Sequence, residues 1–136
     1  MEQALLLKPV DIRTYSPLVL AYIGDAVYEL FIRTRVINRG SMQVNKMHKK
    51  SASLVKAETQ AGMIKALMEE LDEEEMAVYK RGRNARSFTA AKHAAMIDYR
   101  MATGFEALVG YLYLQGRYER LLGLIHDGLE RIGEFT

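Results

Sequence analysis

Apolar residues recur along this chain with helical spacing, and no stretch of useful length shows the alternation typical of strands. Two segments are almost wholly apolar: Leu18 to Arg35, LVLAYIGDAVYELFIRTR, and Ala102 to Leu114, ATGFEALVGYLYL. The only two prolines, Pro9 and Pro17, precede both segments, so no proline interrupts a helix downstream. The pattern therefore predicts an all-α protein.

Capping residues set the expected limits of the first long helix. Ser16 can cap a helix whose first position is Pro17, and Asn38-Arg39-Gly40 provides a suitable end. An amphipathic basic helix is then expected over residues 41–60, with a break near Lys50-Ser51, and a further helical stretch over 61–68.

The second half of the chain is expected to follow the same rules. Asp72 can open a short helix that runs toward Lys80, and residues 80–88, KRGRNARSF, are predicted to form a loop. Ser87 or Thr89 can cap the next helix, which continues or restarts as the second acidic helix over 99–115. Gly116 should end it, and a last amphipathic helix is expected over 118–132.

Length and composition narrow the class of protein. A chain of 136 residues is the size of one domain, so residues 1–136 are expected to fold as a unit. The absence of cysteine excludes disulfides, thiolate metal sites and a cysteine nucleophile. The N-terminus lacks the features of a secretory signal, and charged residues interrupt the longest apolar helix. We therefore expect a cytoplasmic protein that does not cross a membrane.

Charge is unevenly distributed, although the formal net charge is only +2. Residues 30–57 hold seven Lys or Arg and no acid, and residues 76–97 hold five and no acid. Between these blocks, residues 69–75 hold six acids in seven positions. The basic blocks suggest a surface for a polyanion, whereas the acidic run is interpreted as a solvated face at a helix start.

Two acids stand out because each lies within an apolar helix. A buried carboxylate is costly unless it is paired or bound to a metal, so Asp25 needs a partner. Glu106 is the acid of the other apolar segment, and we interpret the two as one site. Mg²⁺ prefers such oxygen ligands and is usually held by one or two carboxylates together with substrate phosphate. The spacing alone leaves open a capping or salt-bridging role for each acid.

Three motifs in order resemble those of a known family. IGDAVYEL resembles the signature helix of the ribonuclease III catalytic domain, and TGFEALVGYLYL resembles its second acidic helix, with GRNARS between them. The short length points to the short bacterial branch of that family, Mini-ribonuclease III, which lacks a separate RNA-binding domain. The resemblance covers residues 15–116.

The resemblance implies a Mg²⁺-dependent endoribonuclease that cleaves double-stranded RNA and leaves a 5′-phosphate, with Asp25 and Glu106 as catalytic and metal-binding residues. It also implies a homodimer formed through the signature helix, in which Tyr22 contacts the partner. The implied substrate is the 23S ribosomal RNA precursor, with a ribosomal protein as a possible assisting partner.

The chain departs from the larger members of the family, in which four acids line each site. Leu18 and Ala21 stand where those enzymes have glutamates, and Thr103 stands where they have an aspartate. A site with fewer acids should hold at most one ion firmly.

Two groups of residues are the candidates for binding RNA. Arginine pairs well with phosphate, asparagine can reach a ribose hydroxyl, and duplex RNA is recognised mostly by its shape. The first group is Arg81, Arg83, Asn84, Arg86 and Lys92, and the second is His48, Lys49 and Lys50.

Other titratable residues have simpler interpretations. Glu29 is expected to form a salt bridge with Arg33 four residues later, with a role near the metal as the alternative. His48 could carry a proton or instead be structural, and His93 and His126 are interpreted as structural. Two alternative functions remain at this point: a non-catalytic helical RNA-binding or ribosome-associated module, and an interaction protein whose basic faces meet an acidic partner.

Overall fold

A computed structural model describes residues 3–40, 43–85 and 93–134 of the chain, and all regular structure within them is helical. The all-α prediction is thus confirmed. The elements are η1 (Ile12–Thr14), α1 (Pro17–Asn38), α2 (Val44–Val55), α3 (Ala57–Leu67), η2 (Met68–Glu70), α4 (Glu73–Arg83), α5 (His93–Leu114) and α6 (Tyr118–Arg131).

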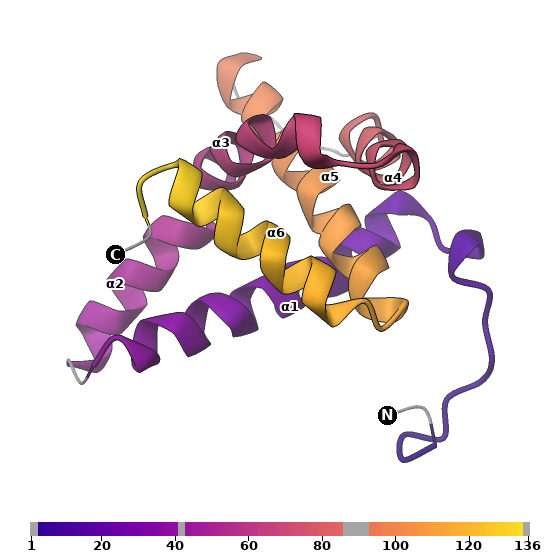
Figure 1. Cartoon of the computed structure of the whole chain (residues 1–136), viewed down its shortest axis with the longest axis horizontal. Coiled ribbons are helices and arrows are strands. Elements are labelled where there is room, and N and C mark those ends of the chain that lie inside the picture. The colour runs from indigo at the N-terminus through magenta and orange to yellow at the C-terminus, as the bar shows by residue number, and fades with distance from the viewer. Residues whose placement is uncertain (1–2, 41–42, 86–92, 135–136) are drawn as a thin grey trace.

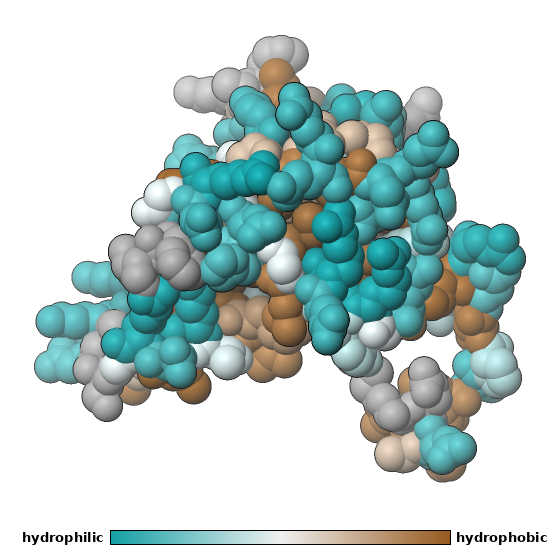
Figure 2. Space-filling view, in the orientation of Figure 1, coloured by the Kyte–Doolittle hydropathy of each residue, from teal (hydrophilic) through white to brown (hydrophobic). Residues whose placement is uncertain are grey.

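Helix α5 is the centre of the bundle. It packs against α1, α3, α4 and α6, and its most apolar part is buried on almost every side (Figure 1). This explains why residues 102–112 carry so few polar side chains. Figure 2 shows a largely polar face over α3, α4 and α6, with apolar side chains gathering along the lower edge. An exposed N-terminal arm, residues 3–10, leads away from the helices and contains a turn at residues 3–6, in which the Leu6 amide donates to the carbonyl of Gln3 at 3.2 Å (Figure 1).

The expected limits of α1 are confirmed. The side chain of Ser16 accepts a hydrogen bond from the Val19 amide at 3.2 Å, and Pro17 is the first helical residue. The helix ends at Asn38, and Gly40 follows with a φ of 123°, which few other residues adopt. Of the described helices, none is long and apolar enough to span a membrane.

The predicted break near Lys50-Ser51 was wrong in position. Helix α2 continues to Val55, and the break falls at Lys56, whose backbone is extended with a ψ of 153°. Ser51 and Leu54 are both buried, so the turn that contains them is held against the core. The chain bends only after this buried turn, and α3 then starts at Ala57.

Helix α4 begins as expected but ends later. Asp72 and Glu75 form a capping box, in which Asp72 accepts from the Glu75 amide at 2.8 Å and Glu75 accepts from the Asp72 amide at 3.0 Å. Glu75 is fully buried, so the acidic run is not a uniformly solvated face. The helix reaches Arg83, so Lys80, Arg81 and Arg83 lie on its last turns and not in a loop.

The last two helices match the prediction closely. Helix α5 is continuous from His93 to Leu114, while the expected capping residues Ser87 and Thr89 lie outside the described residues. Gly116 has a φ of 73°, and the Arg117 amide donates to the carbonyl of Leu112, which is the expected glycine stop.

Candidate active site

Glycine allows α1 and α5 to cross in direct backbone contact. A Cβ atom at Gly24 would lie 1.8 Å from the carbonyl oxygen of Glu106, and one at Gly110 would lie 2.1 Å from the carbonyl oxygen of Leu20. Neither distance can be accommodated, because both obstacles are backbone atoms. The residue after Gly24 is Asp25, so this crossing brings the two acids of the apolar helices together. Gly104, by contrast, makes room for the ring of Tyr79 on α4.

An aromatic pair fixes the same crossing from within the core. The rings of Tyr28 and Phe105 meet edge to face, with centroids 5.6 Å apart and an interplanar angle of 80°. The Tyr28 hydroxyl donates to the carbonyl oxygen of Leu54 at 2.7 Å and so ties α2 to the same point. Tyr28 follows Asp25 by one turn and Phe105 adjoins Glu106, which holds both acids on rigid backbone.

The two acids meet, but they differ in burial. Asp25 is exposed, whereas Glu106 is half-buried and lies within hydrogen-bonding reach of the Asp25 carboxyl. The expectation that Asp25 would be the buried charge was wrong, because its side chain leaves α1 on the solvent side of the crossing. The expectation that it would find Glu106 as a neighbour agrees with this arrangement.

The electrostatics of Glu106 reflect this neighbour. Burial, a hydrogen bond with Asp25 and repulsion from the Asp25 charge together raise the pKa of Glu106 to about 8. Two adjacent carboxylates do not readily ionise together unless a cation offsets their charge. The pair is therefore suited to a divalent cation.

Gln60 is a third polar residue at the site, and sequence reasoning missed it. It is 2% exposed, and its amide nitrogen lies 3.5 Å from Oε2 of Glu106. This contact opposes the other influences by lowering the pKa of Glu106. Its position in the sequence could have revealed it. The buried face of α3 is otherwise apolar, and Gln60 is its one strongly polar member beside Ala61, Met63, Ile64 and Leu67.

The ligand set of this site is small. Within residues 3–40, 43–85 and 93–134, no group of three or more His, Cys, Asp or Glu side chains is arranged to hold a metal ion. Two carboxylates still fit Mg²⁺, which commonly retains several waters and takes its remaining ligands from substrate phosphate. Thr103, in the position of a family aspartate, is buried and donates to the carbonyl of Tyr99 at 2.9 Å.

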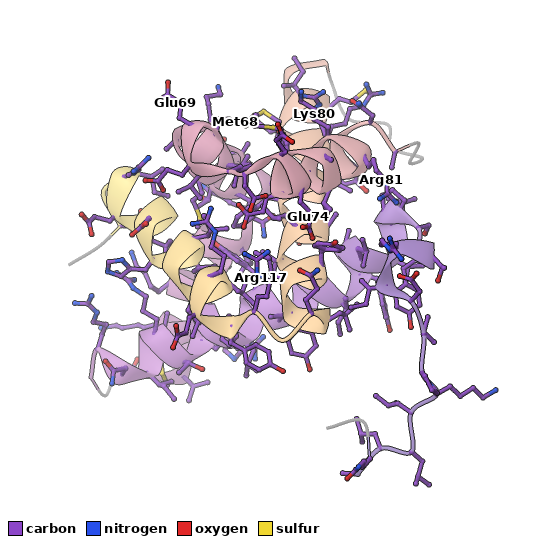
Figure 3. The ribbon with its side chains drawn as sticks, turned by 45° about the vertical axis from the view of Figure 1, so that its right-hand side comes forward. Met68, Glu69, Glu74, Lys80, Arg81 and Arg117 are labelled. Atoms are coloured by element: carbon purple, nitrogen blue, oxygen red, sulfur yellow. The ribbon has the colours of Figure 1, made fainter. Side chains whose placement is uncertain are left out.

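The described members of the first group of RNA-binding candidates, Arg81, Arg83 and Asn84, lie at the end of α4. Lys80 and Arg81 are exposed on the outside of this helix, while Glu74 points to the side on which Arg117 lies (Figure 3). Arg83 lies over the ring of Tyr79, 5.7 Å from its centroid, and donates to Oδ1 of Asn84 at 3.2 Å. Arg86 and Lys92 lie outside the described residues.

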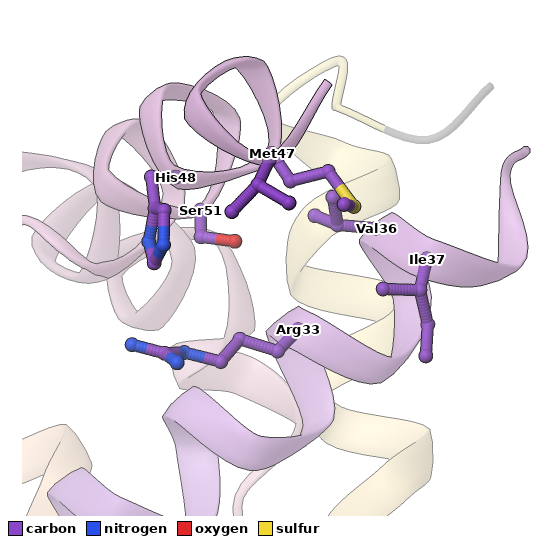
Figure 4. A pocket seen from close by; sticks show the side chains of 7 residues that line it. Arg33, Val36, Ile37, Met47, His48 and Ser51 are labelled. Atoms are coloured by element: carbon purple, nitrogen blue, oxygen red, sulfur yellow. The ribbon is translucent and has the colours of Figure 1, made fainter. Parts of the chain in front are cut away.

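The second group is carried by α2, at the far end of α1. His48, Lys49 and Lys50 are exposed, and Lys50 pairs with Glu134 at 2.8 Å. His48 borders a small pocket that Arg33 also lines (Figure 4). The expected salt bridge between Glu29 and Arg33 is present at 2.8 Å.

An apolar face runs along the solvent side of α1. Tyr22 is 82% exposed and Leu30 is 60% exposed, and Leu18 and Val19 extend the same face. A groove lined by Leu30, Phe31, Tyr118 and Leu122 continues it toward α6. An uncovered surface of this kind is typical of a protein-protein contact.

Known proteins resemble this chain over most of its length. The family model described as the ribonuclease III domain matches residues 18–117. Mini-ribonuclease 3 of Clostridium tetani is 55% identical over 112 residues, which cover 82% of this chain and 74% of the relative. Mini-ribonuclease 3 of Thermoanaerobacter sp. is 45% identical, with 98% and 94% covered. A crystal structure of a Fusobacterium nucleatum protein superposes with a TM-score of 0.79 at 32% identity, covering 93% of this chain and all of the other.

Proposed function

The chain belongs to the ribonuclease III family and is a double-strand-specific endoribonuclease, and we propose that it works through one Mg²⁺ held by Asp25 and Glu106. The observation that carries this proposal is the contact between the two carboxyls at a backbone crossing of α1 and α5. No other described pair of acids combines a half-buried carboxyl of raised pKa with an exposed one beside it.

The difference in exposure between Asp25 and Glu106 suggests that the two acids have different roles in catalysis. Glu106 is anchored beside the core, so its carboxylate is a fixed ligand. Asp25 is exposed and is the acid that substrate reaches first. A bound Mg²⁺ would supply two things: it would neutralise a phosphoryl oxygen and lower the pKa of an attacking water. Asp25 and Glu106 would hold this ion, and their two negative charges would offset its positive charge beside the scissile phosphate.

The reaction is hydrolysis of a phosphodiester. The oxygen of a water molecule bonds to phosphorus while the bond from phosphorus to O3′ breaks, which leaves a 5′-phosphate and a 3′-hydroxyl. We assign the exposed carboxyl of Asp25 as the group that accepts the proton of the attacking water, directly or through a second water. This assignment keeps Glu106, the acid with the less accessible side chain, as a ligand only.

We assign duplex binding to two sets of mainly basic side chains, one from the last turns of α4 onward in the sequence and the other on α2. The first set comprises Arg81, Arg83, Asn84, Arg86 and Lys92, and the second comprises His48, Lys49 and Lys50. Their support is the exposure of Lys49 and Arg81 and the absence of acids from residues 30–57 and 76–97. Such residues recognise phosphates and 2′-hydroxyls across a minor groove.

We assign the apolar face of α1 to a second copy of the chain. A pair of copies would provide two acid pairs, one for each strand of the duplex, and would cover Tyr22 and Leu30. Sedimentation of the purified protein should give the mass of a dimer, and Tyr22→Asp should shift it toward monomer, because a charge would be buried at the contact. A wild-type monomer at micromolar concentration would contradict the assignment.

The motif resemblance further suggests a place for this activity. It implies trimming of the 23S ribosomal RNA precursor in the cytoplasm, with a ribosomal protein helping to select the site. Deleting the gene should leave extended 23S ends, which primer extension would detect, and restored expression should remove them. Normal 23S ends in the deletion strain would contradict this role.

The decisive experiment separates catalysis from binding. Asp25→Asn should reduce duplex cleavage in Mg²⁺ by about 1,000-fold, since a lost metal ligand is worth several kcal/mol of barrier. Its duplex affinity, measured without metal, should stay within about twofold of wild type. Arg83→Ala should do the opposite, weakening binding and flattening its salt dependence. Cleavage that survives Asp25→Asn would remove the metal role.

A further inference from the structure

We propose that Gln60 is a positioning residue of the nuclease site, holding the Glu106 carboxylate in the orientation in which it binds the metal. This inference rests on the proposed metal role of Asp25 and Glu106. It adds a third residue, from a different helix, to a site that the sequence motifs describe as two acids.

The burial of Gln60 is the first reason. Its side chain is 2% exposed, although glutamine is usually found at the surface. The stripe that surrounds it on α3, comprising Ala61, Met63, Ile64 and Leu67, is apolar and buried. A leucine or methionine would suit this position for packing alone, so a buried amide calls for a polar partner.

The identity of that partner is the second reason. The amide nitrogen of Gln60 lies 3.5 Å from Oε2 of Glu106, a long hydrogen bond that crosses from α3 to α5. The carboxyl of Asp25 meets the same Glu106 side chain. Glu106 is therefore held by an amide from α3 while Asp25 approaches it from α1, and a rotation about its side-chain bonds would break one contact or both.

The chemistry of an amide suits this role better than that of a cation. A lysine or arginine at position 60 would neutralise Glu106 and compete with Mg²⁺ for its charge. A neutral N–H donor fixes one carboxylate oxygen and leaves the negative charge available to the metal. Partners of this kind, which hydrogen-bond a ligating carboxylate, typically contribute 10- to 100-fold to metal affinity or activity.

The test compares Gln60→Leu and Gln60→Met with a matched control, Ile64→Val, which perturbs the same buried face of α3. Mn²⁺ binding to the RNA-free protein is measured by the electron paramagnetic resonance signal of the free ion. Both Gln60 variants should bind Mn²⁺ about 10-fold more weakly and need about 10-fold more Mg²⁺ for half-maximal cleavage. Their melting temperatures in EDTA should equal or exceed that of wild type, since an apolar side chain replaces a buried amide. Ile64→Val should leave both metal titrations unchanged.

The outcomes separate this proposal from the one on which it rests. Unchanged Mn²⁺ and Mg²⁺ titrations in both Gln60 variants would overturn the positioning role. If Asp25→Asn and Glu106→Gln abolish Mn²⁺ binding in the same assay, the failure concerns Gln60 alone. If Asp25→Asn and Glu106→Gln bind Mn²⁺ as tightly as wild type does, the proposed metal role of Asp25 and Glu106 is wrong. If one Gln60 variant fails to fold, the metal titrations of the other variant test the proposal. If Ile64→Val weakens Mn²⁺ binding as much as the Gln60 variants do, the effect is due to packing and the positioning role is wrong.

Discussion

Two glutamates, the fully buried Glu75 and the half-buried Glu106, show how the same residue type can serve structure in one place and, as we propose, chemistry in another. Glu75 accepts from Arg120 at 2.8 Å and 2.7 Å and from the Asp72 amide at 3.0 Å. The neighbours of the Glu106 carboxyl are the carboxyl of Asp25 and the amide nitrogen of Gln60, which lies 3.5 Å from Oε2. Arg120 compensates the charge of Glu75 within the chain, whereas no cationic side chain pairs with Glu106 in the described residues, which leaves its charge to a proton or to the proposed metal ion.

The pKa values move in opposite directions for this reason. Hydrogen bonds from Arg120 hold the pKa of Glu75 below its usual range despite burial. Burial and the Asp25 carboxyl raise the pKa of Glu106 to about 8. Loss of solvent acts to raise the pKa of both glutamates, so it cannot distinguish an acid of the proposed site from a structural one. The nature of the compensating partner does.

The largest effect is expected from separating the acids of the functional site. Gly24→Ala places a methyl group where the carbonyl oxygen of Glu106 lies, so α1 must move away from α5. Chemical denaturation should show a loss of at least about 3 kcal/mol, the upper end of overpacking costs. Cleavage should fall as Asp25 leaves Glu106.

Gly123→Ala is the matched control for this change. A Cβ atom at Gly123 of α6 would meet nothing within 4 Å, so helix propensity should raise stability by about 0.5–1 kcal/mol. A Gly24→Ala protein as stable and active as wild type would show that the crossing does not set the site.

The next effect compares the two glutamates directly. Glu75→Gln leaves Arg120 without its charged partner and should cost about 2 kcal/mol in unfolding free energy, less than for a fully buried pair because the Arg120 side chain is 35% exposed. Glu106→Gln should instead stabilise the metal-free protein at pH 8, because it removes the charge that Asp25 repels. Equal signs for the two substitutions would remove the distinction drawn between them.

The smallest effect is a dependence on pH. The pKa of Glu106 is higher in the folded protein than its ordinary value of 4.5. Its protonated form therefore contributes stability to the metal-free protein that is fully present below pH 4.5 and is lost as the pH rises toward about 8. The lowered pKa of Glu75 contributes stability above 4.5, which is lost as pH falls through its folded value. Thermal melts in EDTA from pH 5 to 8.5 should show wild type losing at least about 1.4 kcal/mol relative to Glu106→Gln, the equivalent of one pKa unit.

Under the proposed metal role, Mg²⁺ should reverse that loss, because it would favour the ionised form of Glu106. Its affinity should rise with pH up to about 8 as fewer protons must be displaced. A Mg²⁺ affinity that does not change over this range would contradict the assignment of Glu106 as a ligand. The Glu75→Gln protein is the control here, since its metal titration should follow that of wild type.

Local sequence determined most of the secondary structure and pointed to both acids of the proposed site. Ser16, Asp72 and Gly116 mark helix ends because capping depends only on neighbouring residues, and apolar periodicity gave the buried face of each helix. Asp25 and Glu106 could be singled out because a charge within an apolar helix is visible in the sequence itself.

Tertiary structure decided which of the two acids is the less exposed, which side chains contact Glu75 and Glu106, and where the chain bends between α2 and α3. The contacts of Gln60 with Glu106 and of Arg120 with Glu75 join residues 46 and 45 positions apart. They depend on how α3 and α6 pack against their neighbours, and no local pattern specifies that geometry. The position of the bend at Lys56 also depends on packing, because the core holds the preceding turn of α2, in which Ser51 and Leu54 are buried. Caps and periodicity act over a few residues, whereas compensation of charge is settled only when distant helices meet.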